Sequence, residues 1–501
     1  MSTQTFDFND LFIFEMANNH QGSVEHGLAI IKAMAALTKK HGIRGAIKFQ
    51  FRHLDTFVHP EHRKGSTNKH VPRFLSTALS EGQFAEMASM ARAAGLLVMT
   101  TPFDEPSVGM ALRLGVDILK VASCSGTDYP LLREMARAGK PVLASNGGLS
   151  ELQTGLLVET FDEVGVPFAL QHCVAKYPTE IHDLQLREIT RLKRWFPQLT
   201  IGFSTHERPE RTDIIQMAYA KGARTFEKHV GIPTDKITLN AYSASPEQVD
   251  AWLGAWAVAK AAEGGDERIV DEVERTSLLE LQRGVYAKRR IKVGETITQD
   301  DVYRAFPPVS NQWLSGEFIE GVAATRDFEP NASIGRPVFD KPEVDLVRAA
   351  VVQARMMINA AGAMLPKEFK WELSHHYGMA QYDKVGLTMV EIVNYAYCHK
   401  LLVVFPGQGN PLHFHRIKKE TFRVIGGELD TECGGKRQML RPGDLFTVEP
   451  GEWHQFRSTD GCVFEEISTT QLPDDSFYHD ESISKRSREA RKTRVPGTRR
   501  S

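Results

Sequence analysis

Short apolar runs alternate with longer amphipathic stretches in the first half of the chain. Each run is continuously apolar, which is typical of parallel strands buried on both faces. Between the runs, apolar residues recur at helical spacing, and several of these stretches end at a glycine, which favours a helix C-terminus there. Eight strands are predicted at residues 12–17, 46–51, 96–101, 118–123, 141–146, 168–174, 200–206 and 224–230.

Eight strand–helix units within about 250 residues predict an α/β fold of the (β/α)8 TIM-barrel type. We assign this barrel to residues 1–260. A doubly wound open sheet is the alternative for alternating strands and helices, but such a sheet rarely has eight regular units.

The pattern changes after residue 260. A charged linker at 261–282 is followed by alternating apolar and polar residues, which predict a small β-rich domain at 283–341. Short strand-like segments between glycine and proline turns then predict a β-barrel of the cupin type, in a domain at 344–475 that begins with a helix. The last segment, 476–501, is rich in Lys and Arg and is expected to be a disordered basic tail.

Composition narrows the class of protein. Hydrophobic residues make up 42% of the 501 residues and charged residues 25%, as in ordinary soluble domains, and a net charge of −2 does not indicate a nucleic-acid surface. No run of about 18 apolar residues is present, so no membrane span is expected, and the polar N-terminus has no signal-peptide core. Five scattered cysteines without a CxxC motif are interpreted as reduced thiols of a cytoplasmic protein.

Polar side chains stand at the C-terminal ends of the predicted strands, where barrel enzymes place their active sites. A single lysine or histidine at such a position would be interpreted as a hydrogen-bonded polar group of the barrel interior. Three lysines and three histidines together indicate an active site. The lysines favour an anion with several charges, such as a phosphate with a carboxylate. His206 and His229 are candidate ligands of a divalent metal, whereas His172 is also consistent with a structural role. The set is Glu15, Lys48, Gln50, Thr100, Thr101, Lys120, Ser123, Ser145, Asn146, His172, Tyr177, Ser204, His206, Glu227, Lys228 and His229.

Seven segments in order carry a family resemblance: EMANNHQG, IKFQ, ASCSGTDYPLL, GKPVLASNGG, LQHCVAKYPT, IGFSTH and FEKHV. They resemble the successive motifs of the N-acetylneuraminate (sialic acid) synthase family, with its legionaminate and pseudaminate relatives, over about residues 11–260. In the small domain, RGVYAKRRIKVGETIT resembles the antifreeze-like (SAF) domain of that family.

The resemblance implies a metal-dependent enzyme that condenses phosphoenolpyruvate with an N-acyl hexosamine in its open aldehyde form and releases phosphate. It implies Mn²⁺ or Mg²⁺ on His206 and His229, and a homodimer in which the SAF domain covers the partner's barrel mouth. The expected phosphoenolpyruvate site comprises Lys48, Lys120, Ser123, Ser145, Asn146 and Ser204. The expected catalytic set is Glu15, Gln50, Tyr177 and Lys228, with Gln50 and Tyr177 near the sugar.

Three positions depart from the pattern of that family. Ser125 stands where the family has Glu, residues 239–240 (LN) fall near its acidic sugar-binding residue, and residues 306–308 (FPP) replace the Arg-containing motif of the SAF domain. All three departures are on the acceptor side, while the phosphoenolpyruvate side is kept. We therefore expect phosphoenolpyruvate as the donor and an acceptor other than N-acetylmannosamine.

The C-terminal domain has a metal motif of its own. His413 and His415 share one face of a strand, Glu420 follows, and His454 completes the spacing of a cupin site for a first-row divalent metal such as Mn²⁺, Zn²⁺ or Fe²⁺. A His-rich surface loop would not keep four ligands at that spacing. The flanking segments WELSHHYGMAQYDKVGLTMVEIVN and HKLLVVFPGQGNPLHFHRIKKE resemble cupins of the D-lyxose isomerase type. Lys418 or Lys400 would then be an acid near the metal, with a solvated lysine as an equal alternative.

Two functional hypotheses follow. In the first, the barrel makes a nonulosonate-like 3-deoxy sugar acid, and the cupin isomerises or binds a sugar. In the second, the chain is a sugar-binding or sensory protein with an idle barrel. The lysines, serines and paired histidines at the strand ends favour the first hypothesis.

Overall fold

The computed structural model describes residues 6–204, 206–265, 268–335, 343–469, 471–472, 474–487 and 489–498. The chain divides into two units, Met1–Ile269 and Val270–Ser501.

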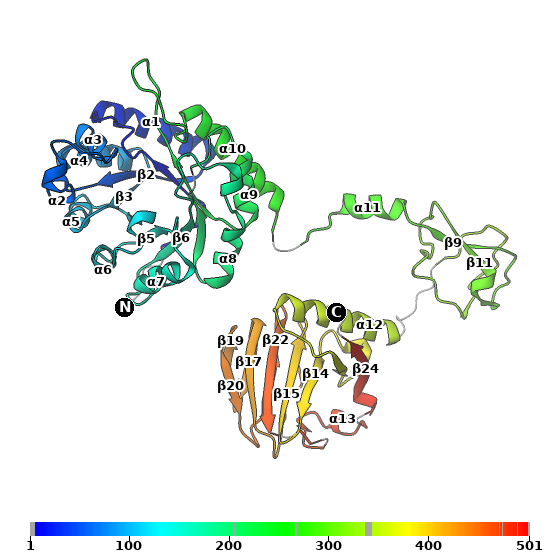
Figure 1. The fold of residues 1–501 in the computed structure, drawn as a ribbon. Coiled ribbons are helices and arrows are strands. Elements are labelled where there is room, and N and C mark those ends of the chain that lie inside the picture. The colour runs from blue at the N-terminus through cyan, green and yellow to red at the C-terminus, as the bar shows by residue number, and fades with distance from the viewer. Residues whose placement is uncertain are drawn as a thin grey trace. The chain divides into compact units, whose positions relative to one another are not determined.

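The first unit is a closed barrel of eight parallel strands in sequential order, surrounded by helices (Figure 1). This architecture confirms the predicted (β/α)8 fold. The strands are β1 Leu11–Glu15, β2 Arg44–Phe51, β3 Leu97–Pro102, β4 Ile118–Val121, β5 Val142–Ser145, β6 Phe168–His172, β7 Thr200–Phe203 and β8 Thr225–His229. The helices are α1 Val24–His41, α2 Leu54–Phe57, α3 Val71–Ser76, α4 Glu81–Ala93, α5 Glu105–Arg113, α6 Tyr129–Arg137, α7 Glu151–Asp162, α8 Arg187–Trp195, α9 Asp213–Ala220 and α10 Pro246–Glu263, with 3-10 turns at Pro60–His62, Ser123–Ser125 and Ile181–Asp183.

Residues of each barrel strand alternate between two apolar layers. Outward side chains pack against the helices, as Phe12 of β1 does against Trp252 and Trp256 of α10, at ring separations of 5.6 and 4.8 Å. Inward side chains such as Leu11 and Ile13 fill the lower part of the barrel. Above them, toward the C-terminal strand ends, the inward positions are polar, and this is where the candidate site lies.

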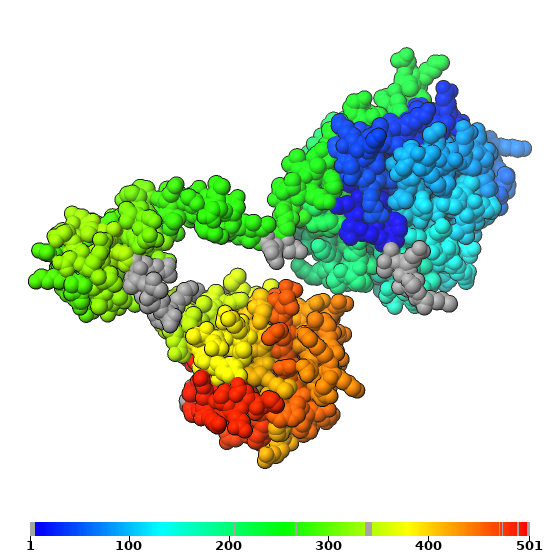
Figure 2. Space-filling model, turned by 180° about the vertical axis from the view of Figure 1, so that it is seen from behind, coloured from blue at the N-terminus to red at the C-terminus, as the bar shows by residue number. Residues whose placement is uncertain are grey.

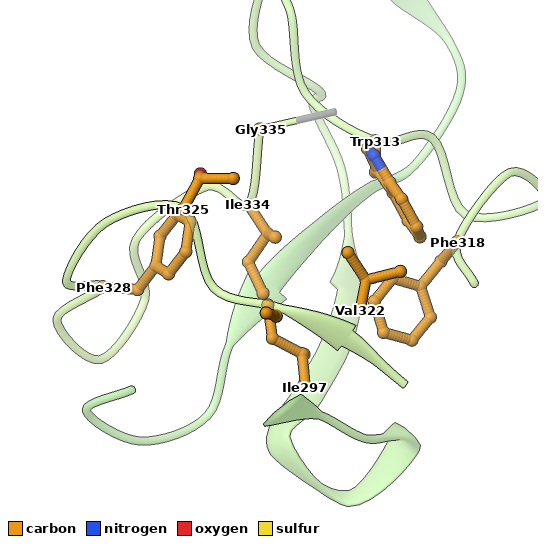
Figure 3. Close-up of a pocket in the computed structure, with 9 residues that line it drawn as sticks. Ile297, Trp313, Phe318, Val322, Thr325, Phe328, Ile334 and Gly335 are labelled. Carbon is orange, nitrogen blue, oxygen red and sulfur yellow. The ribbon is translucent and has the colours of Figure 1, made fainter. Parts of the chain in front are cut away.

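The second unit begins with α11 Glu272–Glu280 and a small β-rich segment. Its strands are β9 Gly284–Ala287, β10 Thr296–Ile297, β11 Val302–Ala305 and β12 Val322–Ala323, with a 3-10 turn at Gln299–Asp301. They form two two-stranded sheets around a core in which Ile297, Trp313, Phe318, Val322 and Ile334 converge (Figure 3). The predicted end of this domain, residue 341, lies outside the described residues, and the likeness to a SAF domain stays a prediction.

The remainder of the second unit contains one long helix, α12 Glu343–Ala360, and two antiparallel sheets. One apolar cluster packs α12 against the larger sheet, and a second is formed by both sheets, where Phe464 meets Phe422 and Phe456 at 5.7 and 5.1 Å. The larger sheet contains β13 Glu368–Ser374, β14 Leu387–Asn394, β15 Tyr397–Val404, β17 Glu420–Gly427, β20 Leu445–Val448, β22 Cys462–Thr469 and β24 Lys492–Thr498. The smaller contains β16 His413–Phe414, β18 Leu429–Cys433, β19 Lys436–Leu440, β21 His454–Arg457 and β23 Phe477–Tyr478, and short helical turns lie at Met379–Gln381, Glu481–Ser484 (α13) and Glu489–Arg491.

The prediction that 476–501 is a disordered tail is wrong for its described residues. β24 pairs with all of β13, and in Figure 2 red atoms from near the C-terminus lie against yellow atoms of the same unit. Two basic residues of this strand are ion-paired, because Lys492 and Arg494 lie 2.5 and 2.7 Å from the carboxylate of Glu372 on β13. Residues 499–501 lie outside the described part of the chain.

Candidate functional sites

A buried lysine between two carboxylates forms the centre of the barrel site. Lys48 Nζ lies 2.7 Å from Glu15 Oε2 and 2.5 Å from Glu227 Oε1. The three meet because β2 and β8 flank β1, with Glu15 in register with Lys48. Burial alone would lower the pKa of Lys48, but the two carboxylates raise it above its usual value, so this amine stays charged. Glu227 was predicted among the polar residues at the strand ends but was given no role there, and the structure shows it as the second carboxylate on Lys48.

A second buried lysine lies on β4. Lys120 Nζ donates to Ser145 Oγ and, at 3.1 Å, to the Val121 carbonyl, while Glu227 Oε2 is 4.0 Å away. Burial lowers the pKa of Lys120 to about 8. It is therefore a buried amine next to hydroxyl groups rather than a member of a close ion pair, as expected of an anion-binding lysine.

The other predicted donor-side residues lie on the loops that follow these strands. Ser123 Oγ accepts the N–H of Gly147 at 3.0 Å, and Asn146 Oδ1 accepts the N–H of Cys173 at 3.2 Å. Both bonds join adjacent strand ends and shape the loop beside Lys120. Ser204 is buried at the end of β7, where its N–H donates to the His172 carbonyl at 2.9 Å.

Two histidines and two tyrosines form a cluster at the ends of β6, β7 and β8. The rings of His206 and His229 are 5.2 Å apart, and Tyr177 lies 4.1 Å from His206. Burial lowers the pKa of both histidines, that of His206 to about 4. Neutral imidazoles side by side have the donor chemistry that a divalent metal requires.

Tyr242, which the sequence did not indicate, closes this cluster. Its ring lies 5.6 Å from His206 and 5.1 Å from His229. Asn240 Oδ1 accepts the N–H groups of Tyr242 and Ser243 at 3.1 and 2.9 Å, and so forms the turn that presents the ring. The oxygen of Asn240 is therefore engaged in the backbone, and the acceptor side is lined by an aromatic ring instead.

The structure does not bring Lys228 into the predicted catalytic set. Its Nζ lies 2.6 Å from Glu207 Oε1, and both residues are buried. Successive strand residues point to opposite faces, so Glu227 and His229 point into the barrel and Lys228 points to the helical layer. His172 also points outward, with Nε2 2.7 Å from the Leu184 carbonyl, which agrees with its structural alternative.

The second candidate site lies in the C-terminal sheets. His413, His415 and His454 place possible ligand atoms within 4.8 Å of one another. Glu420 Oε2 is 3.2 Å from His454 Nε2, and both atoms are buried with no hydrogen-bond partner among the described residues. Such orphaned acceptor atoms fit a bound cation, which would satisfy them. The four predicted ligands are therefore brought together.

Backbone contacts hold these ligands in place. His415 Nδ1 bonds to the Asp475 carbonyl, and the Asp475 carboxylate accepts the N–H groups of Arg416, Ile417 and Lys418 at 2.9, 3.0 and 2.9 Å. Tyr478, in the segment expected to be disordered, stacks on His413 at 5.6 Å. Outer contacts of this kind fix the orientation of a metal ligand.

A buried charge network adjoins the four ligands. Lys418 pairs with Glu420 and lies 3.1 Å from Glu466 Oε1, which Lys400 approaches at 3.3 Å. Both lysines are buried, which excludes the solvated alternative for them. The cavity at this site, about 60 Å³, is also lined by His376, Asn410 and Lys492 and has room for several water molecules.

No helix among the described residues is long and apolar enough to cross a bilayer.

Comparison with known proteins agrees with this two-part architecture. A family model described as "NeuB family" matches residues 34–266, and one described as "Cupin domain" matches 400–465. A crystal structure described as spore coat polysaccharide biosynthesis protein E from Chromobacterium violaceum is 42% identical, covers 65% of this chain and 98% of that chain, and has a TM-score of 0.62.

Two curated relatives are similar over the same region. Pseudaminic acid synthase of Campylobacter jejuni is 27% identical over 327 residues, which is 63% of this chain and 93% of that protein. N-acetylneuraminate-9-phosphate synthase of Mus musculus is 26% identical over 297 residues, which is 58% of this chain and 80% of that protein. With its closed barrel and the extent of these matches, the chain belongs to the NeuB family and carries a cupin domain in its C-terminal part.

Proposed function

We propose that the barrel condenses phosphoenolpyruvate with a sugar aldehyde to give a nonulosonate-like 3-deoxy sugar acid and phosphate. The observation that carries the proposal is the pair of inward lysines, Lys48 and Lys120, at the C-terminal strand ends. The two curated relatives are named as synthases of sugar acids of this class, which supports the same reaction type.

The reaction joins the methylene carbon of phosphoenolpyruvate to the aldehyde carbon, whose oxygen takes up a proton and becomes a hydroxyl. Water then releases phosphate and leaves a keto acid. Lys120, with Ser145, binds and neutralises the anionic donor. Glu15 orients Lys48 and accepts from Gln50 Nε2 at 3.4 Å, so that the amide of Gln50 faces the acceptor.

His206 and His229 would hold a divalent ion, Mn²⁺ or Mg²⁺, because both are buried, adjacent and neutral. When bound, such an ion supplies a Lewis acid for the aldehyde carbonyl. The rings of Tyr177 and Tyr242 stand against these histidines and line the acceptor side.

The cupin is proposed as a second catalytic centre that interconverts an aldose and a ketose. His413, His415, Glu420 and His454 would hold a first-row divalent ion, such as Mn²⁺, Zn²⁺ or Fe²⁺. The chemistry also needs groups that move a proton between adjacent carbons, and Lys418 with Glu466 lies beside the ligand set. A sugar-binding module is the alternative for this domain.

One experiment separates a working barrel from an idle one. The full-length protein is incubated with phosphoenolpyruvate, Mn²⁺ and a panel of aldoses, and phosphate release and phosphoenolpyruvate consumption are followed together. Release that depends on a particular aldose and disappears in His206→Ala supports the synthase. Sugar binding without release under all conditions would favour the sensory alternative.

A cytoplasmic homodimer completes the proposal. It rests on the resemblance of the small β-rich segment to a SAF domain and on the five cysteines, none of which is paired in a disulfide. Light scattering of the purified chain would measure the dimer directly.

A further inference from the structure

Arg52 is a cation of the barrel site that the proposed chemistry does not use. It follows β2 and continues the inward face of Lys48 and Gln50, its Cα about 13 Å beyond that of Lys48 along the strand direction. Its Nη2 donates to Gln50 Oε1 at 3.0 Å. Arg52 therefore stands at the outer end of a polar row that begins at the two lysines.

The guanidinium is held by aromatic rings rather than by a carboxylate. Its central carbon lies 3.7 Å from the ring centre of Phe103 and 4.1 Å from that of Phe74. No carboxylate oxygen lies within 4.0 Å of it in the part of the chain that the structure describes, and its Nε is buried without a hydrogen-bond partner there. Stacking occupies the faces of the planar group and leaves an N–H on its edge unused.

The contrast with Lys48 shows why this arrangement points to a ligand. Lys48 is buried with two carboxylates of its own, whereas the charge of Arg52 is balanced by none within contact distance. A partly buried guanidinium with no carboxylate in contact has lost hydration, and an anion can replace it through charge-assisted hydrogen bonds. Burial lowers the pKa of Arg52 to about 10, so the group remains cationic at neutral pH.

The position of Arg52 indicates that its anion belongs to the acceptor, at the end away from the reacting aldehyde. The donor residues Lys120 and Ser145 lie at the ends of β4 and β5, on other strands than Arg52, while Gln50 separates Arg52 from Glu15. Ser125 and Asn240, which were expected on the acceptor side, carry no charge, and the carboxylates that act on Arg52 from beyond contact distance are Glu15 and Asp104.

We propose that Arg52 is a specificity-determining residue that binds an oxyanion group, phosphate or carboxylate, on the sugar acceptor. The inference rests on the proposed function, since it names the substrate class of the same site. The guanidinium edge binds either group through charge-assisted hydrogen bonds, and the rings of Phe74 and Phe103 hold that edge in position.

The test compares matched acceptors with full-length, Mn²⁺-loaded enzyme. Mannose is set against mannose 6-phosphate and mannuronate, and arabinose against arabinose 5-phosphate, with phosphoenolpyruvate saturating. We expect at least one charged acceptor to exceed its neutral partner in kcat/KM by about 10- to 100-fold. The phosphate and carboxylate arms distinguish the two sources of the oxyanion.

Substitution then locates the effect. Arg52→Gln should abolish the preference while leaving the KM for phosphoenolpyruvate within about threefold, and Arg52→Lys, which keeps the charge, should retain part of it. Arg113→Gln, which removes an exposed arginine paired with Glu81, is the matched control. It should change neither the preference for charged acceptors nor the KM for phosphoenolpyruvate. Equal use of neutral and charged acceptors, or an unchanged preference in Arg52→Gln, overturns the inference and leaves the synthase proposal intact.

A binding measurement keeps the two proposals separable. If no acceptor supports turnover, the synthase proposal fails, and calorimetric titration of mannose 6-phosphate into wild type and Arg52→Gln still decides the inference. Binding that Arg52→Gln weakens supports an oxyanion site, and identical isotherms exclude it. If Arg52→Gln does not fold, the same titration is made with Arg52→Lys, where an unchanged affinity and acceptor preference contradict a guanidinium-specific site.

Discussion

At the residue scale, the protonation of Lys120 should make donor binding in the barrel depend on pH. Burial lowers its pKa to about 8, so the amine is cationic below that pH and neutral above it. Its attraction for an anionic donor is therefore lost as the pH rises through about 8. We predict that kcat/KM for phosphoenolpyruvate falls above this pH, measured with saturating acceptor. Lys120→Arg, if active, should move the fall to higher pH, and a flat wild-type profile through pH 9.5 (roughly one and a half units above the pKa) would contradict the assignment.

Lys120 and Lys228 form a matched pair of buried lysines on opposite sides of the barrel wall. Lys120→Ala should raise the KM for phosphoenolpyruvate by about 10- to 100-fold, because a charged hydrogen-bonding group is lost from the donor site. Lys228→Ala breaks the buried ion pair with Glu207 and should lower the free energy of unfolding by about 3–5 kcal/mol. Steady-state kinetics and denaturant unfolding of both variants separate the roles. An unchanged KM in Lys120→Ala removes this lysine from the site.

The side chain of Asn240 forms the turn that holds Tyr242 beside the two histidines, and so should affect acceptor binding. Asn240→Ala removes the oxygen that accepts the N–H groups of Tyr242 and Ser243, and so frees the ring beside the two histidines. We expect kcat/KM for the acceptor to fall by about 5- to 50-fold while the KM for phosphoenolpyruvate holds. Tyr242→Phe keeps the ring and is the control that should retain acceptor use. N-acetylmannosamine should remain a poor acceptor in all three proteins, and robust turnover with it would contradict the sequence-based expectation.

At the element scale, β24 completes the edge of the larger cupin sheet. Ending the chain at residue 491 removes the seven residues of β24, with both basic partners of Glu372, and exposes the edge of β13. We expect a lower melting temperature for the cupin transition and greater aggregation, since an uncovered edge strand invites pairing with other chains. A chain ending at residue 498 keeps all of β24 and is the control. Identical melting curves for the two truncations would show that the strand adds no stability.

Local patterns predicted the barrel well and the tail poorly, for one physical reason. The barrel strands are continuous apolar runs, so each segment alone predicts a buried strand. Their polar residues indicated Lys48, Lys120, His206 and His229 as candidate site residues. The basic residues of β24, by contrast, pair with Glu372, about 120 residues away, and no local pattern shows this partner. Glu466 was missed for the same reason, because its lysines come from distant parts of the chain, Lys400 from β15 and Lys418 from the loop before β17. Lys228 could have been excluded by strand alternation alone.

At the scale of the whole molecule, two candidate metal centres lie on one chain, in separate units. The barrel pair comprises His206 and His229, and the cupin set comprises His413, His415, Glu420 and His454. No residue is shared between them, so each centre should be disabled without loss of the other. The organisation therefore predicts that condensation and any reaction of the cupin can each be abolished by substitutions that leave the other reaction intact.

We predict that His206→Ala abolishes condensation and leaves the cupin reaction, whereas His413→Ala with His415→Ala does the reverse. Condensation is followed as phosphate release, and the cupin reaction as exchange of the C2 proton of pentoses and hexoses with solvent deuterium. Metal content per chain should fall in each variant, because each loses imidazole ligands from one centre. If metal-loaded wild type shows no exchange with any sugar, the cupin is not an isomerase. If the cupin variants also leave condensation unchanged with every acceptor, the domain is better described as a binding or assembly module, since its metal would then serve neither reaction.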